Sequence, residues 1–279
     1  MTSDTPLWAR EIKSKNEIPK KFIGHIDPYV LSMENLPLMI HMPQHPNEEN
    51  IALDKIIYSY SDNIYLLKEL DNGKIESFTL STKDIFSVEH GKILLYSWLR
   101  LKTPGEFSDG LFMDFNTVME PLFKNLIDIV RLSNKSKHHV DLNYSEAYDI
   151  KSLDYKFQNY INDVLDEGFI IRYLLFQNPF ISSKENKEMT YNHITFLTDG
   201  ELINIKEEPD KTNPSKLCVI WNFVSLSNID KIDIKDYADN DYVSLEITSS
   251  NVKHSLGLFE EKNKEHLYHL ISTVRDLKN

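Results

Sequence analysis

Two stretches of the sequence, FNTVMEPLFKNLIDIVR at residues 115–131 and FEEKNKEHLYHLISTVR at residues 259–275, match each other at a constant offset of 144 residues. Phe115 pairs with Phe259 at this offset, and Arg131 pairs with Arg275. Both stretches place apolar residues three and four positions apart, which predicts an amphipathic helix in each. Because any two amphipathic helices share part of such a pattern, this match alone does not establish a repeat.

Further matches upstream extend the repeat over most of the chain. Lys68 matches Lys206 at an offset of 138, and the offset grows along the chain. Ser81 already matches Ser225 at an offset of 144. The increase falls where the tight turn LDNGK of the first copy corresponds to the longer EEPDKTNPSK of the second. Insertions are tolerated best in such loops, so we interpret the chain as two diverged copies of one module.

Each copy contains seven segments that are rich in β-branched and aromatic residues and bounded by turn residues, which predicts β-strands. In the first copy they cover residues 37–42, 53–60, 64–69, 74–80, 84–90, 92–102 and 109–115. In the second they cover residues 169–177, 190–197, 201–207, 216–224, 228–235, 241–249 and 252–258. Glycine-containing turns are predicted at 71–73 and 89–91. The predicted fold class is α+β, with two modules that are each a seven-stranded antiparallel barrel of two sheets capped by a C-terminal helix.

The matches divide the chain into an N-terminal extension (1–36), a first module (37–133), a linker (134–168) and a second module (169–279). The linker begins as a polar loop and continues as a helix from about Ser152 to Asp166, with Gly168 as its C-terminal stop. This helix could pack between the modules or cover an edge of the second one. A counterpart in the first copy would lie before Pro37, in the ambiguous stretch HIDPYVLSMENLP.

The first copy has YSYSDNIYLLKE followed by FTLSTKDIFSVE, and the second copy has TFLTDGELINIKE and FVSLSNIDKI at the matching places. With seven strands and a C-terminal helix, each copy resembles the bacterial pleckstrin-homology-like (PH-like) domains. The resemblance covers most of 37–133 and 169–278, and it implies two tandem PH-like barrels joined by a linker helix. Neither copy has the tryptophan often found in the C-terminal helix of eukaryotic members, since Val130 and Val274 stand there.

The resemblance would first imply phosphoinositide binding, which needs several Lys or Arg side chains at the loop between the first two strands. Those loops are QHPNEEN and NPFISSKENKE, in which Lys184 and Lys187 are the only candidates. The net charge of −12 also disfavours contact with nucleic-acid phosphates or an anionic membrane surface. We therefore predict no nucleic-acid partner and expect membrane binding to be unfavourable.

No motif for a cofactor or a catalytic group stands out, so no cofactor is predicted. The candidate metal ligands are His41 with His45, and His138 with His139 and Asp141. The first pair spans a strand end and a Pro-containing loop, and the second group lies in the polar linker, so neither has two imidazoles on one helix face. An enzyme whose active site is assembled from scattered residues remains an alternative.

The location of the protein is inferred from three features. The only cysteine, Cys218, lies in the apolar run LCVIW, which predicts a packed thiol and excludes an internal disulfide. No apolar run approaches the ~18–20 residues of a membrane span. The N-terminal residues lack the apolar core of a signal peptide. These features predict a cytoplasmic protein.

The segment ILLYSWLRL at 93–101 is apolar on both faces of a predicted strand, although a barrel strand needs only one buried face. Tyr96, Trp98 and Arg100 share one face, and these three residue types are enriched at binding hot spots. Either the C-terminal helix or the other module covers this face, or the face is a partner-binding patch. The leading hypothesis is a non-enzymatic interaction protein that binds a protein or peptide partner. Lipid association and catalysis are the alternatives, and a homo-oligomer stays open.

Overall fold

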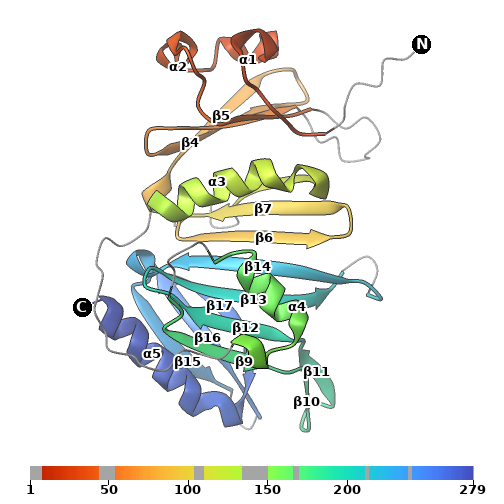
Figure 1. The fold of residues 1–279 in the computed structure, drawn as a ribbon, viewed down its shortest axis with the longest axis vertical. Coiled ribbons are helices and arrows are strands. Elements are labelled where there is room, and N and C mark those ends of the chain that lie inside the picture. The colour runs from red at the N-terminus through yellow and green to blue at the C-terminus, as the bar shows by residue number, and fades with distance from the viewer. Residues whose placement is uncertain are drawn as a thin grey trace. The chain divides into compact units, whose positions relative to one another are not determined.

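The computed structural model describes residues 8–43, 54–103, 110–133, 150–165, 170–210, 214–237 and 241–278. They form an α+β fold dominated by antiparallel sheets (Figure 1), as predicted. The chain divides into two compact units. The first comprises the chain up to Ile85 with Leu94–Leu99 and Phe112–Ser133, and the second comprises Phe86–Ile93, Arg100–Leu111 and the remainder.

The first unit contains a five-stranded sheet in the order β1-β2-β3-β4-β5. Its strands are β1 (Arg10–Glu11), β2 (Met39–Met42), β3 (Lys55–Tyr60), β4 (Asn63–Glu69) and β5 (Ile75–Ser81). The helices of this unit are α1 (Lys20–Ile23), α2 (Pro28–Ser32) and α3 (Glu120–Ser133). Phe22 of α1 and Val30 of α2 are fully buried and share one core with Ile56 and Tyr58 of β3, so α1 and α2 cover one face of this sheet.

A seven-stranded sheet has the order β8-β7-β6-β14-β13-β12-β9, and a three-stranded sheet has the order β15-β16-β17. The strands of the first half in the larger sheet are β6 (Ser87–Ile93), β7 (Tyr96–Lys102) and β8 (Leu111–Asn116). The strands of the second half are β9 (Tyr173–Gln177), β12 (His193–Leu197), β13 (Glu201–Pro209), β14 (Leu217–Ser225), β15 (Lys231–Asp236), β16 (Tyr242–Ser249) and β17 (Val252–Glu260). A separate hairpin is formed by β10 (Phe180–Ser182) and β11 (Lys187–Thr190), and the helices are α4 (Tyr155–Asn162) and α5 (Lys264–Lys278).

The order of the elements repeats along the chain as the sequence predicts. Strands β2 to β8 precede α3, and strands β9 and β12 to β17 precede α5. The hairpin β10–β11 departs from the prediction, because most of its residues were expected to form a loop. No sheet of the described residues closes on itself, so the closed barrels of the prediction are not seen as continuous hydrogen-bonded sheets.

The helix expected in the linker packs on a sheet of the second unit. It is shorter than predicted, and Asp154 caps its start by accepting a hydrogen bond from the Lys156 N–H at 3.0 Å. The ring of Phe157 meets Phe176 of β9 edge-on, with centroids 5.1 Å apart. Figure 1 shows α4 lying across the strands of this sheet. The predicted stop at Gly168 lies outside the described residues.

A lysine–glutamate ion pair recurs in both halves between a short helix and a strand. Lys21 Nζ of α1 lies 2.7 Å from Glu69 Oε2 of β4, and Lys156 Nζ of α4 lies 2.9 Å from Glu207 Oε2 of β13. The two glutamates are 138 positions apart, as in the sequence alignment, and the phenylalanine after each lysine is fully buried. Helix α1 is therefore the counterpart of α4, and it lies upstream of the stretch in which a counterpart was sought.

Strand β6 pairs with β14 inside the second unit, from Ser87 opposite Val224 to Lys92 opposite Val219. Six of the nine residues of β14 are buried. The corresponding strand of the first half, β5, is an edge strand among the described residues, and within it only Leu80 is buried. The apolar side chains of β14 favour its pairing with a further strand, β6. The polar side chains of β5 disfavour pairing of its free edge with another strand.

The predicted turn at 89–91 is wrong, because these residues lie inside β6. The chain turns instead at Leu94 and Leu95, which are 71% and 67% exposed. Leu94 has φ of 51°, a conformation usually left to Gly, Asn or Asp. The apolar segment 93–101 therefore begins with a tight turn that contains no glycine, so the sequence carried no turn signal there. The other predicted turn, at 71–73, is confirmed by Gly73 with φ of 74°.

Candidate functional site

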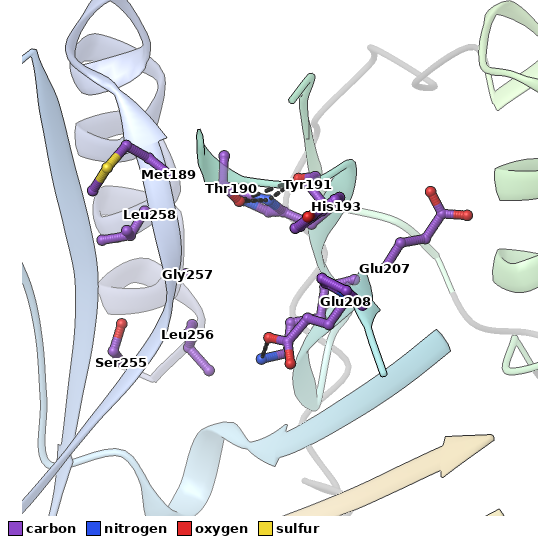
Figure 2. Close-up of a pocket in the computed structure, with 12 residues that line it drawn as sticks. Met189, Thr190, Tyr191, His193, Glu207, Glu208, Ser255, Leu256, Gly257 and Leu258 are labelled. Atoms are coloured by element: carbon purple, nitrogen blue, oxygen red, sulfur yellow. Dashed lines mark hydrogen bonds and ion pairs between the residues drawn. The ribbon is translucent and has the colours of Figure 1, made fainter. Parts of the chain in front are cut away.

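A cleft of about 450 Å³ opens in the second unit between β17 and the strands β11, β12 and β13 (Figure 2). One wall consists of residues 255–258 of β17. The other wall consists of residues 189–191, His193 and residues 206–209. This volume falls within the roughly 300–1,000 Å³ typical of ligand pockets. Figure 2 shows that the lining mixes apolar residues, such as Met189 and Leu258, with polar residues, such as Thr190, Ser255 and Glu208.

The wall formed by β17 is a strand edge. β17 pairs with β16 and is the last strand of its sheet among the described residues. The pairing shifts register, since Leu245 lies opposite Gly257 and Glu246 lies opposite Ser255. Leu256 is therefore the extra residue of a β-bulge, and it is buried in the core of the unit. The bulge redirects the strand at the cleft and places Gly257 against the opposite wall.

His193 is the first residue of β12 and belongs to the wall opposite β17. Its side chain is only 2% exposed. Its Nδ1 lies 3.2 Å from both the Tyr191 carbonyl oxygen and Thr190 Oγ1. An Nδ1–H that donates to the Tyr191 carbonyl leaves Nε2 as an acceptor. Nε2 is buried and has no hydrogen-bond partner among the described residues. Burial lowers the pKa of His193 to about 4, an effect that the bond to Tyr191 opposes and the charge of Lys206 reinforces.

Gly257 brings the backbone of β17 close to the imidazole of His193. A Cβ at this position would lie 3.3 Å from His193 Nε2, closer than most real contacts of that kind. The ring of Phe259, two residues further along β17, packs edge-on against the imidazole with centroids 4.7 Å apart. Because residue 257 is glycine, the backbone of β17 itself packs against His193 Nε2.

The charges that line the cleft are nearly balanced. Lys206 forms an ion pair with Glu208, which Figure 2 shows at the cleft. Glu207 points away from the cleft in the same view, toward its ion pair with Lys156 of α4. The lining residues thus present one cation and one anion, and these neutralise each other.

The hairpin β10–β11, which supplies Met189 and Thr190 to the cleft, is held to the start of β16. Asp241 accepts hydrogen bonds from the Ser182 hydroxyl at 2.6 Å and from the Ser183 N–H at 2.8 Å. The bond from Ser182, assisted by those from Ser183, lowers the pKa of Asp241 to about 2. These contacts make Asp241 one of the residues that hold the hairpin at the end of the cleft.

Replacing Asp241 by alanine is expected to loosen this hairpin, because the bonds from Ser182 and Ser183 are lost. Amide hydrogen exchange of the hairpin should become severalfold faster while exchange in β12 and β13 stays unchanged. Asp233→Ala, which removes a carboxylate from the more exposed pair with Lys231 on β15, is the matched control. Unchanged protection of the hairpin in the Asp241 variant would show that other contacts hold it.

The corresponding corner of the first half is built differently. Lys55 pairs with β4 at the strand position that His193 occupies in the second half. Met113, 144 positions before Gly257, is fully buried where the second half has no side chain. Lys55 Nζ also lies 4.0 Å from Asp114 Oδ1. A large side chain and an ion pair thus stand in the first half where the second half has its cleft.

The sequence-predicted patch lies on β7, and none of its three residues lines the cleft. Tyr96 is 44% exposed, and its ring centroid lies 5.9 Å from that of Trp98. Trp98 and Arg100 are half-buried, and Arg100 Nε lies 3.9 Å from Glu89 Oε1. The three residues share the more exposed face of the strand, as predicted. Their role in binding a partner stays a prediction.

Sequence reasoning missed the residues of the cleft, because they come from four strands and no spacing links them. Of the metal candidates, His41 is buried in β2, 3.8 Å from Asp54 Oδ2. His45, His138, His139 and Asp141 lie outside the described residues. Cys218 is buried as predicted, its thiol donates to the Glu208 carbonyl oxygen at 3.0 Å, and burial raises its pKa. Lys184 and Lys187 are exposed on the hairpin.

No helix in the described part of the chain is both long and apolar enough to cross a membrane. No protein-family model matches the sequence, and no curated protein matches it either. The interpretation of the cleft therefore depends on its own geometry and chemistry.

Proposed function

We propose that the chain is a non-enzymatic cytoplasmic interaction protein built from two tandem PH-like modules. Its second module binds an extended peptide segment of a protein partner in the cleft beside β17. The observation that carries this proposal is a strand edge that forms one wall of a cleft with a mixed polar and apolar lining. In strand addition, main-chain hydrogen bonds to such an edge supply affinity, and pockets for alternate side chains supply specificity.

The chemistry of the cleft suits a peptide. A peptide offers backbone donors and acceptors to β17 and places side chains against Met189 and Leu258. Methionine adapts its shape to irregular apolar partners, which favours a surface that accommodates a side chain. Because the Lys206–Glu208 pair is internally neutralised, the cleft does not demand a strongly charged ligand.

The repeated architecture supports the tandem-module part of the proposal. Both halves have the same order of strands and a final helix, and both carry the lysine–glutamate pair between a short helix and a strand. What two copies share maintains the fold, and what differs is available for function. The corner that holds the cleft in the second half is one of the clearest differences between them.

Peptides that bind the full chain can be selected from a displayed library of random linear peptides and measured by fluorescence anisotropy. Gly257→Met introduces the residue that the first half has at this position and fills the space beside His193. We expect it to weaken binding at least about tenfold, as the loss of a central contact does. Lys253→Met, on an exposed position of β17 outside the cleft, is the matched control and should bind normally.

Normal peptide binding by a folded Gly257→Met variant would place the binding surface elsewhere. If that variant fails to fold, Leu258→Asp tests the same wall without crowding His193. The proposal also fails if no selected peptide competes with another for the site, since a single cleft binds one segment at a time.

A further inference from the structure

We infer that copies of this chain associate head to tail, with the edge of β15 in one copy paired antiparallel to the edge of β5 in the next. This pairing repeats, between molecules, the one that β6 and β14 make within the chain. It goes beyond peptide binding and involves none of the residues that line the cleft.

The first argument is the strand pair that the chain already contains. β6 pairs antiparallel with β14. At the offset of 144 residues that aligns the two halves, β6 corresponds to β15, and β5 corresponds to β14. The repeat therefore supplies both strands of this pair twice, and the chain joins only one set of them.

The second argument is that the other two strands have open edges among the described residues. β5 is the last strand of the five-stranded sheet, and β15 is the first strand of the three-stranded sheet. An edge strand presents unpaired backbone N–H and C=O groups that can pair with another chain. Because β5 and β15 belong to separate sheets of one chain, we assign their pairing to two copies.

The third argument is that the register of the internal pair brings opposite charges together. Ile220 of β14 lies opposite Gly91 of β6, and the residues 144 positions away are Glu76 and Lys235. Opposite charges directly across an antiparallel pair are favourable. Glu76 is exposed, and the side chain of Lys235 is 52% exposed although it also pairs with Glu246. Both side chains can therefore meet across the proposed interface.

The pairing between copies is weaker than the pairing within the chain. Trp221 of β14 stacks on His90 of β6, and the aligned residues of β5 and β15 are Ser77 and Ile234. The polar side chains of β5 disfavour an apolar strand, but they suit β15, in which four of the six residues are charged. We therefore expect a reversible association that depends on the protein concentration.

A contact of this kind is heterologous, because it joins different surfaces of the two copies. Each added copy brings one new β5 edge and one new β15 edge. Copies would thus form an open chain, or a ring if the rotation between neighbours closes.

The test measures association of the full chain by analytical ultracentrifugation at concentrations up to the millimolar range. Glu76→Lys and Lys235→Glu each place like charges opposite each other, and each should weaken association about tenfold. An equimolar mixture of the two variants should associate as the wild type does, because each β5 then meets a complementary β15 of the other variant. Glu265→Lys and Lys253→Glu, at exposed positions outside both strands, are the matched controls and should associate normally.

The two charge reversals shift the net charge in opposite directions, so a general charge effect would not weaken association in both. A wild-type chain that stays monomeric at every concentration overturns the inference. Association that either reversal leaves unchanged, or that the mixture does not restore, overturns it as well.

If a charge-reversal variant fails to fold, cross-linking decides. A chain with Glu76→Cys and a second chain with Lys235→Cys must form a mixed disulfide under mild oxidation, since cross-strand neighbours lie within the reach of a disulfide. Ser77→Cys in place of Glu76→Cys is the control, because residue 77 points to the opposite face of β5. Failure of the first pair to cross-link would overturn the inference, and peptide binding, tested by Gly257→Met, would be unaffected.

Discussion

Replacement of Trp221 by alanine is expected to lower the free energy of unfolding by about 3–5 kcal/mol, the usual cost of truncating a large buried aromatic side chain. Stable domains have a total of only about 5–15 kcal/mol, so this single change should bring the second unit close to unfolding. Trp221 is 2% exposed and lies on β14, at the place where β6 joins the sheet.

The expected loss is large because several elements pack on one indole. The ring stacks on His90 of β6, with centroids 5.2 Å apart, and meets Tyr160 of α4 edge-on at 5.7 Å. Its Nε1–H donates to the Tyr160 carbonyl oxygen at 3.4 Å, and Lys92 Nζ lies 5.2 Å from the ring centroid. Alanine would leave a cavity that two strands and a helix cannot all fill at once.

Urea denaturation of the full chain measures this effect, and Trp98→Ala is the matched control. Trp98 is half-buried on β7, so its truncation should cost clearly less than that of Trp221. The same samples, examined by analytical ultracentrifugation, test the partner-patch hypothesis for Tyr96, Trp98 and Arg100. A large stability loss in Trp98→Ala without a change in association would contradict that hypothesis.

Acidification from about pH 7 to about pH 4 is expected to destabilise the fold by about 3 kcal/mol for each of two histidines. Burial lowers the pKa of His90 to about 4, and Lys92 adds to the effect. Burial is likewise the main cause of the pKa of about 4 at His193. Both values lie well below the ~6.5 of an unfolded histidine.

The sign of the change in the free energy of unfolding depends on whether the folded or the unfolded state binds more protons. Between about pH 6.5 and about pH 4 the unfolded chain protonates both imidazoles while the folded chain keeps them neutral. The free energy of unfolding therefore falls as the pH falls through this window. It is unaffected by these two groups above the window, and below it no further loss comes from them.

The pH dependence of urea unfolding measures this linkage. His193→Gln and His90→Gln should each make the slope between about pH 6.5 and about pH 4 shallower, because each removes one titrating imidazole. His25→Gln, at an exposed position, should keep the wild-type slope. A slope that stays the same in both buried-site variants would mean that other groups cause the acid sensitivity.

The candidate site shows where sequence reasoning reaches its limit. Gly257 stands in a predicted strand and His193 begins another, but nothing in their spacing links them. The only sequence signal was indirect: at the aligned positions the first copy has Met113 and Lys55, and unlike residues at matched positions mark a difference between copies. That signal identifies a place to look, but it does not reveal a cleft.

The sequence by itself determined the α+β class, the order of the strands, the final helix of each half and the repeat of that order. These features depend on residues close together in the chain, whose side-chain alternation and turn chemistry act locally. Only the tertiary structure decided that β6 pairs with β14, that the chain turns at Leu94, and that β17 faces His193 across a cleft. The choice of partner for a strand edge depends on side chains far apart in the sequence, such as Trp221 and His90, and local patterns carry no information about which distant edges meet.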